Sequence, residues 1–335
     1  MQQTVEELIR AILNKKESMM YHYIKKLLEE DKTQKSKRFV ESALENLEKL
    51  QNQQNRLIEL PMNLKGKIKQ ETADSFPIDR YIITKDIENI TNEIIKIHNV
   101  QQELKELNIN YFPTLLLYGK SGCGKTMIAR YIALKTDLPY YYINFSELIS
   151  SALGQTANNL SKIFEFIKKY PGVLCIDEAD TIGQVRTSNA KDAQGEMNRI
   201  TITMMQEIEK ELSNSIVIAT TNFDENIDTA LKRRFSKIYE VKPFTFEEAT
   251  EFVSNFFKSA QIIVMDEQNK SWGKEMCQKW LHNKIKEKYQ PDEYTKFISN
   301  QKPFITPSYL NKICTERLID ILIAAKEKKN NEKSK

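Results

Sequence analysis

Apolar side chains recur at helical spacing through roughly the first sixty residues of the chain. They form three groups, which are Val5, Leu8, Ile9 and Ile12; Tyr23, Ile24, Leu27 and Leu28; and Val40, Ala43, Leu44 and Leu47. Pro61 closes this pattern, and the polar stretch that follows, with Gly66 and Pro77, is typical of a linker. We therefore predict an all-helical N-terminal domain at residues 1–62, suited to recognising a partner, and a linker at residues 63–78.

Between Asp79 and Val241 short apolar runs alternate with segments of helical periodicity. The runs are Thr114–Tyr118, Tyr140–Asn144, Val173–Asp177, Ile216–Ala219 and Ile238–Val241. Strands that alternate with helices favour a parallel sheet with helices packed on both faces. The fold class predicted for residues 79–242 is therefore α/β.

From Pro243 onward the periodicity is helical again. The candidate helices are Phe246–Phe257, Lys274–Tyr289 and Pro307–Ala325. We predict a helical region at residues 243–328 and a disordered, Lys-rich tail at residues 329–335.

The composition narrows the function classes. A formal net charge of +4 over 335 residues does not indicate a strong nucleic-acid footprint. The chain has no run of eighteen apolar residues and no start typical of a signal peptide, so we expect neither a membrane span nor secretion. Three histidines and four scattered cysteines, Cys123, Cys175, Cys277 and Cys314, argue against a His/Cys metal site and favour reduced thiols in the cytoplasm.

A glycine-rich stretch follows the first apolar run and opens a helix. Gly119 is followed after four residues by Gly124, Lys125 and Thr126, which is the spacing of a phosphate-binding loop. Glycines let backbone N–H groups turn towards phosphates, the lysine adds a positive charge, and the threonine hydroxyl is a ligand for Mg²⁺. A chance glycine-rich turn is the alternative, and the flanking strand and helix disfavour it. The residues predicted to bind the nucleotide here are Gly119, Lys120, Ser121, Gly122, Cys123, Gly124, Lys125, Thr126 and Met127.

The run Val173–Asp177 ends in carboxylates about fifty residues after the glycine-rich stretch. We predict that Asp177 holds the Mg²⁺ of the nucleotide through water, because a parallel strand can deliver it beside the phosphate loop. Glu178 is predicted to orient and deprotonate the attacking water. A solvated acidic turn is the alternative.

Three further polar residues lie downstream. Asn222 follows an apolar strand and is predicted to hydrogen-bond the γ-phosphate or the attacking water, with a plain turn residue as the alternative. The adjacent Arg233 and Arg234 suit donation to charge that develops on the γ-phosphate of a neighbouring subunit. A basic surface turn or a structural salt bridge is the alternative for this pair.

Cys123 lies inside the glycine-rich stretch at a helix N-terminus, where a thiol pKa can fall. We hypothesise that alkylation of this thiol blocks nucleotide binding. The alternative is a small residue that only fills space.

These motifs, in this order and spacing, resemble those of the AAA family of ATPases from about Asp79 to Val241, and more weakly to the end. The resemblance implies ATP and Mg²⁺ as cofactors, a five-stranded parallel sheet, a C-terminal helical lid and assembly into a ring, usually a hexamer. It places the packing of the adenine near Tyr81, Ile82 and Ile83. Residue by residue it extends to Gly119, Gly124, Lys125, Thr126, Asp177, Glu178, Asn222, Arg233 and Arg234.

Two stretches depart from the family pattern. At Ser151–Gln155, Ala152 stands where many members carry an aromatic residue that grips polypeptide in the pore, although Leu153 is apolar. At Thr306–Leu310 the usual Ser-Gly-Ala-Asp turn is replaced, and no sensor arginine is present there. The pattern therefore predicts an ATPase that lacks the aromatic residue with which many members hold polypeptide in the pore.

A finer resemblance covers the N-terminal helices, the linker and the run SELISSALGQTANNLSKIFEFI. These are similar to bacterial stand-alone AAA ATPases, which are often encoded beside a subtilisin-like serine protease in clusters suspected of anti-phage defence. The chain has no GxSxG and no HExxH motif, so proteolysis is expected only from a partner.

Three functions compete at this stage. The leading prediction is a ring-forming ATPase that remodels or delivers a protein partner. A more specific version of this prediction adds a companion protease. The second is a slow nucleotide-dependent assembly switch that licenses an effector. The third, a nucleic-acid-dependent ATPase, is disfavoured by the nearly balanced charge and the lack of a recognisable DNA-binding motif.

Overall fold

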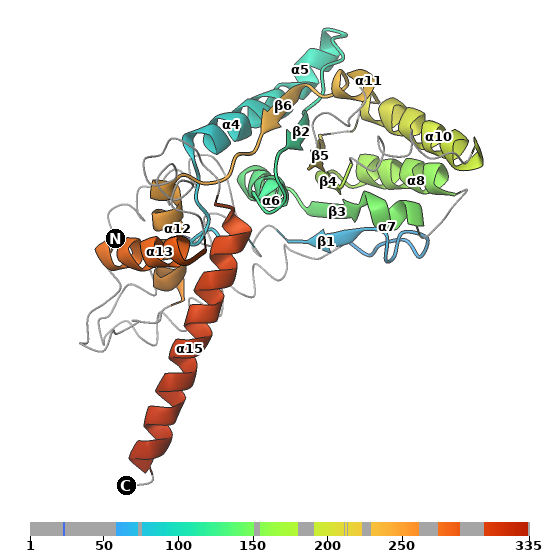
Figure 1. Ribbon diagram of the computed structural model, residues 1–335. Helices are drawn as coiled ribbons and strands as arrows, with labels where there is room; N and C mark the ends of the chain where they lie inside the picture. The colour runs from blue at the N-terminus through green and yellow to red at the C-terminus, as the bar shows by residue number, and fades with distance from the viewer. Residues whose placement is uncertain are drawn as a thin grey trace, which may run out of the picture. The chain divides into compact units, whose positions relative to one another are not determined.

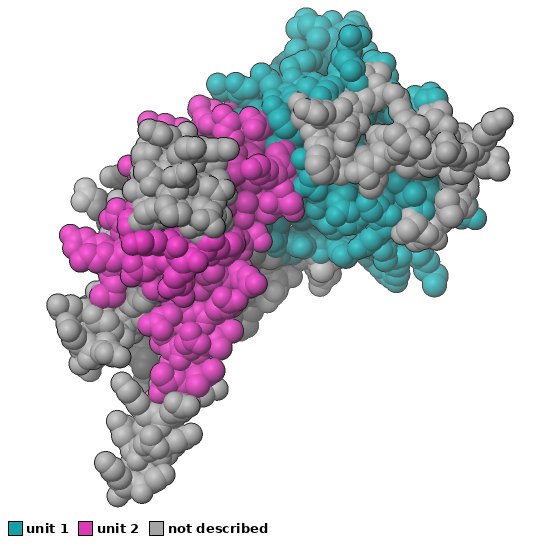
Figure 2. Space-filling model, in the orientation of Figure 1, with its two compact units in different colours: residues 1–76, 90–118, 126–239 teal, residues 77–89, 119–125, 240–335 magenta. Residues whose placement is uncertain are grey.

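The computed structural model (Figure 1) describes Tyr23 and residues 58–72, 76–150, 155–179, 191–210, 212, 214–222, 229–260, 274–288 and 305–333. Its contacts divide the chain into two compact units, which Figure 2 colours separately. Unit 1 comprises Met1–Phe76, Ile90–Tyr118 and Thr126–Tyr239, and unit 2 comprises Pro77–Asn89, Gly119–Lys125 and Glu240–Lys335. Most of the predicted N-terminal helical domain, and the stretch 151–154 with Ala152, lie outside the described residues.

A six-stranded sheet with the order β1-β3-β4-β5-β2-β6 is the main feature of unit 1 (Figure 1). The strands are β1 Lys69–Glu71, β2 Thr114–Tyr118, β3 Tyr140–Asn144, β4 Val173–Asp177, β5 Ile216–Thr221 and β6 Lys237–Glu240. The pairings β3·β4, β4·β5 and β2·β5 are parallel, which places the C-terminal ends of these strands at one edge of the sheet. β1 runs antiparallel to β3.

The prediction of a five-stranded parallel sheet is wrong in number and in direction, because β1 adds a strand from the segment predicted to be a linker. β1 has three residues, all polar, so it leaves no apolar alternation in the sequence. Leu64 and Ile68, which are 2% and 3% exposed, anchor the segment just before it in the core of unit 1. This anchor holds a polar segment at the edge of β3.

Helices alternate with the strands of unit 1, as predicted. Those that lie wholly or mostly in it are α4 Lys85–Asn99, α5 Gln101–Glu106, α6 Lys125–Thr136, α7 Phe145–Ser150, α8 Thr156–Lys169, α10 Lys191–Ile208 and α11 Thr229–Lys232. α6 follows β2, α7 and α8 follow β3, and α10 follows β4. The parallel strands are therefore joined by helical crossovers, which parallel pairing requires.

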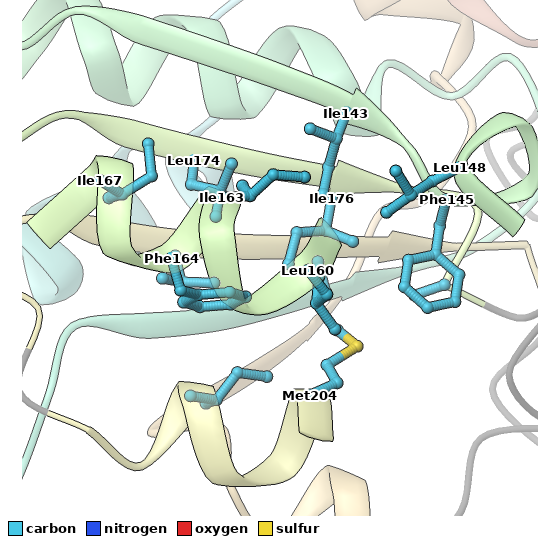
Figure 3. Close-up of a cluster of buried hydrophobic side chains, with 14 of the residues drawn as sticks. Ile143, Phe145, Leu148, Leu160, Ile163, Phe164, Ile167, Leu174, Ile176 and Met204 are labelled. Carbon is cyan, nitrogen blue, oxygen red and sulfur yellow. The ribbon is translucent and has the colours of Figure 1, made fainter. Parts of the chain in front are cut away.

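One face of the sheet packs against α8 and α10 (Figure 3). The side chains in this contact are at most 1% exposed and include Ile143, Leu160, Ile163, Phe164, Ile167, Leu174, Ile176 and Met204. Burying each such side chain stabilises the fold by about 1.5–3 kcal/mol. This packing fixes β3 and β4, the strands whose ends carry candidate site residues.

Unit 2 contains α12 Phe246–Ser259, α13 Lys274–Lys288 and α15 Pro307–Lys333. α12 begins with a reciprocal cap, in which the Thr245 side chain accepts from Glu248 N–H and the Glu248 carboxylate accepts from Thr245 N–H. The three helices share an apolar cluster that includes Phe246, Val253, Leu281, Ile285 and Leu310. No helix in the described ranges is long and apolar enough to cross a membrane.

The three helices predicted from periodicity after Pro243 are confirmed, but α15 is longer than predicted. It continues to Lys333, into the segment 329–335 that was predicted to be a disordered tail. Lysine and glutamate have high helix propensity, so a strongly charged sequence can extend a helix that already has a nucleus.

Candidate active site

The glycine-rich stretch forms a loop between β2 and α6. Gly119, Gly122 and Gly124 have φ angles of +140°, +79° and +93°, which side chains other than glycine rarely adopt. The Lys125 side chain folds back across this loop and donates to the carbonyls of Gly119 at 2.8 Å and Lys120 at 3.1 Å. Only 7% of Lys125 is exposed, so a positive charge is held within the loop that is predicted to bind phosphate.

Gly119 has a second constraint besides its φ angle. A Cβ atom built on Gly119 would lie 2.3 Å from the carbonyl oxygen of Val241, closer than side-chain carbons pack. Gly119→Ala should therefore lower the free energy of unfolding by about 2–4 kcal/mol, combining overpacking with a left-handed residue. Gly66 has φ +81° and no atom within 4 Å of such a Cβ, so Gly66→Ala is a matched control and should lose only about 1–2 kcal/mol. Equal losses of unfolding free energy in denaturant titrations would contradict the close approach.

The start of α15 packs against the same loop. Ser308 N–H donates to the Gly122 carbonyl at 3.2 Å, and a Cβ atom on Gly122 would lie 2.9 Å from the Ser308 Cβ. Thr306 caps α15, since its hydroxyl accepts from Tyr309 N–H at 3.3 Å. The stretch that departs from the family pattern thus supports the phosphate loop through its backbone, a role that side-chain motifs did not indicate.

The structure does not support a reactive thiol at Cys123. The residue is 4% exposed, and burial raises the pKa of its thiol despite the opposing charges of Lys125 and Lys120. The helix N-terminus was expected to lower this pKa, whereas desolvation of the thiolate by burial acts in the opposite direction. Burial of Cys123 thus favours the alternative interpretation, a small residue that fills space inside the loop.

Asp177 ends β4 and receives hydrogen bonds on both carboxylate oxygens. Thr220 and the Glu178 N–H, the latter at 3.1 Å, donate to Oδ1. The hydroxyl groups of Thr126 and Tyr142 donate to Oδ2 at 3.2 Å and 3.1 Å. The carboxylate is therefore fixed between the end of β4, the first turn of α6 and the neighbouring strands β3 and β5.

Thr126 and Asp177 fit a Mg²⁺ ion that arrives with a nucleotide. Their side chains supply hydroxyl and carboxylate oxygens, and Mg²⁺ typically takes one or two carboxylates together with phosphate oxygens and water. In the part of the chain that the structure describes, no group of three or more His, Cys, Asp or Glu residues could hold a metal ion. Thr126 and Asp177 supply only part of a Mg²⁺ coordination shell, so they suit a metal that also binds phosphate oxygens and water.

Glu178 adopts a backbone conformation that is rare for its residue type. Its φ angle is +60°, in the left-handed region where residues other than glycine typically lose about 1–2 kcal/mol. The preceding residue, Asp177, is held by the hydrogen bonds to its carboxylate. The following residue, Ala179, donates its N–H to the Thr220 carbonyl at 2.9 Å. Such a conformation persists because its surroundings determine it, and the Glu178 side chain is half-buried.

Asn222 directly follows β5, and its side chain is half-buried. β4 and β5 pair in parallel, and Ala179 after β4 donates to the carbonyl of Thr220 within β5, so Glu178 and Asn222 follow neighbouring strands at the same edge of the sheet. Met127 is half-buried on α6, and its sulfur lies 3.8 Å from the guanidinium of Arg130. Lys120 and Ser121 are exposed.

The two arginines lie elsewhere. Arg233 and Arg234 are exposed and follow α11, and Arg234 forms an ion pair with Glu209. A pocket of about 420 Å³ beside them is lined by Asn110, Tyr111, Phe112, Thr114, Ile208, Glu209, Arg233, Arg234, Phe235 and Ser236. The structure does not group the arginines with Asp177 and Glu178.

The segment expected near the adenine has mixed exposure. Ile82 is 4% exposed and belongs to the apolar cluster of unit 2, whereas Ile83 is 40% exposed.

Tyr142 and Thr220 are site residues that sequence reasoning missed. Tyr142 was part of an apolar run, where tyrosine is common because it suits strands. No sequence pattern carried this role, because it depends on the register of β3 and β4, in which Asn144, two residues from Tyr142, pairs with Asp177. Burial and the nearby Asp177 carboxylate raise the pKa of Tyr142, which keeps its hydroxyl protonated as a donor.

Comparison with known proteins agrees with these features. The family described as "ATPase family associated with various cellular activities (AAA)" matches residues 115–243. An uncharacterized AAA family ATPase of Sinorhizobium fredii, y4kL, is 32% identical over 145 residues, which are 43% of this chain and 43% of that protein. A proteasome-activating nucleotidase of Saccharolobus islandicus is 30% identical over 176 residues, 51% of this chain and 45% of that protein. The same-named protein of Sulfurisphaera tokodaii is 32% identical over 169 residues, 49% of this chain and 43% of that protein.

The chain therefore spans less than half the length of each of these curated relatives. The matched residues contain the phosphate loop, Asp177 with its four hydrogen-bond donors, and both arginines. These findings support an ATPase domain of the AAA type over residues 115–243, with ATP hydrolysis as its reaction.

Proposed function

We propose that this chain assembles into a ring in which ATP·Mg²⁺ bound to one subunit is hydrolysed with help from the arginines of the next, and that the ring remodels a protein partner. The observation that supports shared sites most directly is the position of Arg233 and Arg234 at the opposite end of β2 from the phosphate loop. The hexamer is the expected form of the ring.

The arginines are tied to the first residue of β2. Thr114 Oγ1 donates to the Arg234 carbonyl at 3.3 Å, and Ser236 Oγ donates to the Thr114 carbonyl at 2.6 Å. The phosphate loop begins at Gly119, directly after the last residue of β2. Four strand steps separate Thr114 from Tyr118, which is roughly 13 Å at about 3.3 Å a step. The arginines therefore suit the site of a neighbouring subunit better than their own.

Each residue of the site has a proposed role. Lys125 and the loop N–H groups bind the phosphates, and Thr126 and Asp177 hold Mg²⁺, which neutralises charge on the phosphate oxygens. Glu178 accepts the proton of the attacking water, and Asn222 orients the γ-phosphate or that water. Arg233 and Arg234 stabilise the charge of the transition state across the interface.

A protein partner is supported by the relatives. Two of them are nucleotidases named for activating a proteasome, which is itself a protein assembly. The N-terminal segment at residues 1–62 is the proposed recognition domain, and the C-terminal helices at residues 243–328 are the proposed lid. A subtilisin-like protease as companion, and a role in anti-phage defence, rest on the finer resemblance alone. A cytoplasmic location suits this role.

A slow nucleotide switch is the second candidate, and the ion pair between Arg234 and Glu209 favours it. The pair occupies Arg234 within its own chain, with 42% and 46% of the two side chains exposed. Exposed ion pairs typically contribute about 0–1 kcal/mol, so a neighbour's phosphates can displace Glu209. Assembly would then determine when hydrolysis starts.

The shared-site proposal is tested by the ATP turnover per subunit over a range of protein concentrations, with the assembly state followed by light scattering. Turnover per subunit should rise as monomers assemble and then reach a plateau. Constant turnover per subunit down to concentrations at which only monomers remain would overturn it. The remodelling role would need a further result, unfolding of a protein that co-purifies with the ATP-bound ring.

A further inference from the structure

Tyr142 is a polar residue of the site to which the roles above assign nothing. We propose that Tyr142 is a positioning residue, whose hydroxyl fixes the Asp177 carboxylate for binding the metal–nucleotide complex, and whose ring is held by Lys69 of the edge strand β1. The inference rests on the proposed role of Asp177 as the residue that holds Mg²⁺. It assigns the additional strand of the sheet a part in the site.

Sheet register brings the two side chains together. On β3 and β4, Tyr142 pairs with Cys175, and Asp177 lies two residues beyond Cys175 on the same face. Diagonal neighbours of this kind are about 7–8 Å apart, a distance that a tyrosine side chain can span. The bond of 3.1 Å from the Tyr142 hydroxyl to Asp177 Oδ2 is thus a consequence of register and of residue type.

The hydrogen bond from Tyr142 restricts the rotation of the Asp177 carboxylate about its terminal torsion. The terminal torsion of an aspartate is broad, so a carboxylate keeps one orientation only when both of its oxygens are held. Thr220 and the Glu178 N–H hold Oδ1, and Thr126 and Tyr142 hold Oδ2. Thr126 is itself an expected metal ligand, which leaves Tyr142 as the donor to Oδ2 with no other role.

β1 contributes through Lys69. This residue pairs with Tyr142 across the antiparallel β1·β3 ladder, and its ammonium lies 5.6 Å from the centroid of the tyrosine ring. A cation over the ring face attracts it electrostatically. On the same strand, Glu71 forms an ion pair with Arg130, one helical turn after Thr126 on α6. β1 therefore contacts both elements that donate to Asp177 Oδ2.

Tyr142→Phe tests the proposal, because it removes the hydroxyl and keeps the ring. The readout is the binding of a fluorescent ADP analogue to the full chain, measured in EDTA and over a Mg²⁺ titration. In EDTA the affinity should stay within about twofold of the unsubstituted protein. The Mg²⁺ concentration at half-saturation should rise about tenfold, since a hydrogen bond to a charged group is lost.

Tyr141→Phe is the matched control. Tyr141 is the preceding residue, is fully buried on the opposite face, and its hydroxyl has no hydrogen-bond partner in the described structure. This variant should leave the Mg²⁺ midpoint unchanged. Lys69→Gln keeps the Tyr142 hydroxyl in place and should raise the midpoint about twofold.

Two outcomes would overturn the proposal. The first is a Tyr142→Phe variant with the Mg²⁺ midpoint of the unsubstituted protein, and a lower melting temperature beside that unchanged midpoint would make the role purely structural. The second is nucleotide binding by the unsubstituted protein that does not respond to Mg²⁺. The second result would also remove the metal-binding role of Asp177, whereas the first would leave that role intact.

Discussion

Replacing Arg233 or Arg234 by alanine should lower the ATP turnover of assembled chains by about 10³–10⁵-fold and leave nucleotide affinity nearly unchanged. The reason is geometric, because Thr114 and Ser236 hold this arginine segment at the start of β2, away from the phosphate loop that follows its end. A side chain that meets the nucleotide only across an interface stabilises the transition state without contributing much to binding. The measurement is turnover at saturating ATP, together with nucleotide affinity from equilibrium binding.

Lys232→Ala is the matched control, since it removes the same charge from the neighbouring position at the end of α11. It should change turnover by less than about threefold. Mixing the arginine variant with Glu178→Gln chains should restore part of the activity, because some interfaces then combine an intact arginine pair with an intact Glu178. Mixed rings with no recovered turnover at any ratio would contradict shared sites.

Glu178→Gln should retain ATP binding and lose about 10²–10⁴-fold in turnover, because the amide cannot accept the proton of the attacking water. The substitution keeps side-chain length, so the residue can hold its φ of +60° at a cost similar to that of glutamate. Single-turnover hydrolysis with labelled ATP separates the chemical step from product release.

Asp137→Asn is a control matched in backbone conformation, since Asp137 also has a positive φ, +58°. It follows α6 at the end remote from Lys125, roughly 18 Å away along a helix that rises about 1.5 Å a residue. Its turnover should match that of the unsubstituted protein. A Glu178→Gln variant that hydrolyses ATP as fast as this control would exclude Glu178 as the base.

Much of the α/β region could be predicted from the sequence because its strands are buried on both faces. Such strands, among them β2, β4 and β5, read as continuous apolar runs, and the helices between them have a distinct period. The phosphate loop could also be predicted, because its positive φ angles require glycines, which are visible in the sequence. Patterns of this kind are local, so a single sequence carries them.

The features that could not be predicted from the sequence depend on contacts between distant segments. β1 is polar and owes its place to the burial of Leu64 and Ile68. Tyr142 contacts Asp177 only once β3 and β4 are in register. Ser308, which donates to the Gly122 carbonyl, lies 186 positions further along the chain. The raised pKa of Cys123 reflects burial that no local pattern records.

The contact between the start of α15 and the phosphate loop bears on how fragments of this protein should be cut for expression. The family match ends at residue 243, which makes that position a tempting C-terminal boundary. A fragment ending there would omit Thr306 and Ser308. The Gly122 carbonyl would then lose the hydrogen bond that it accepts from Ser308 N–H. It would also omit α12, α13 and α15, and with them nearly all of the apolar cluster of unit 2. The smallest useful fragment therefore extends through α15, even though sequence similarity alone would place the boundary far earlier.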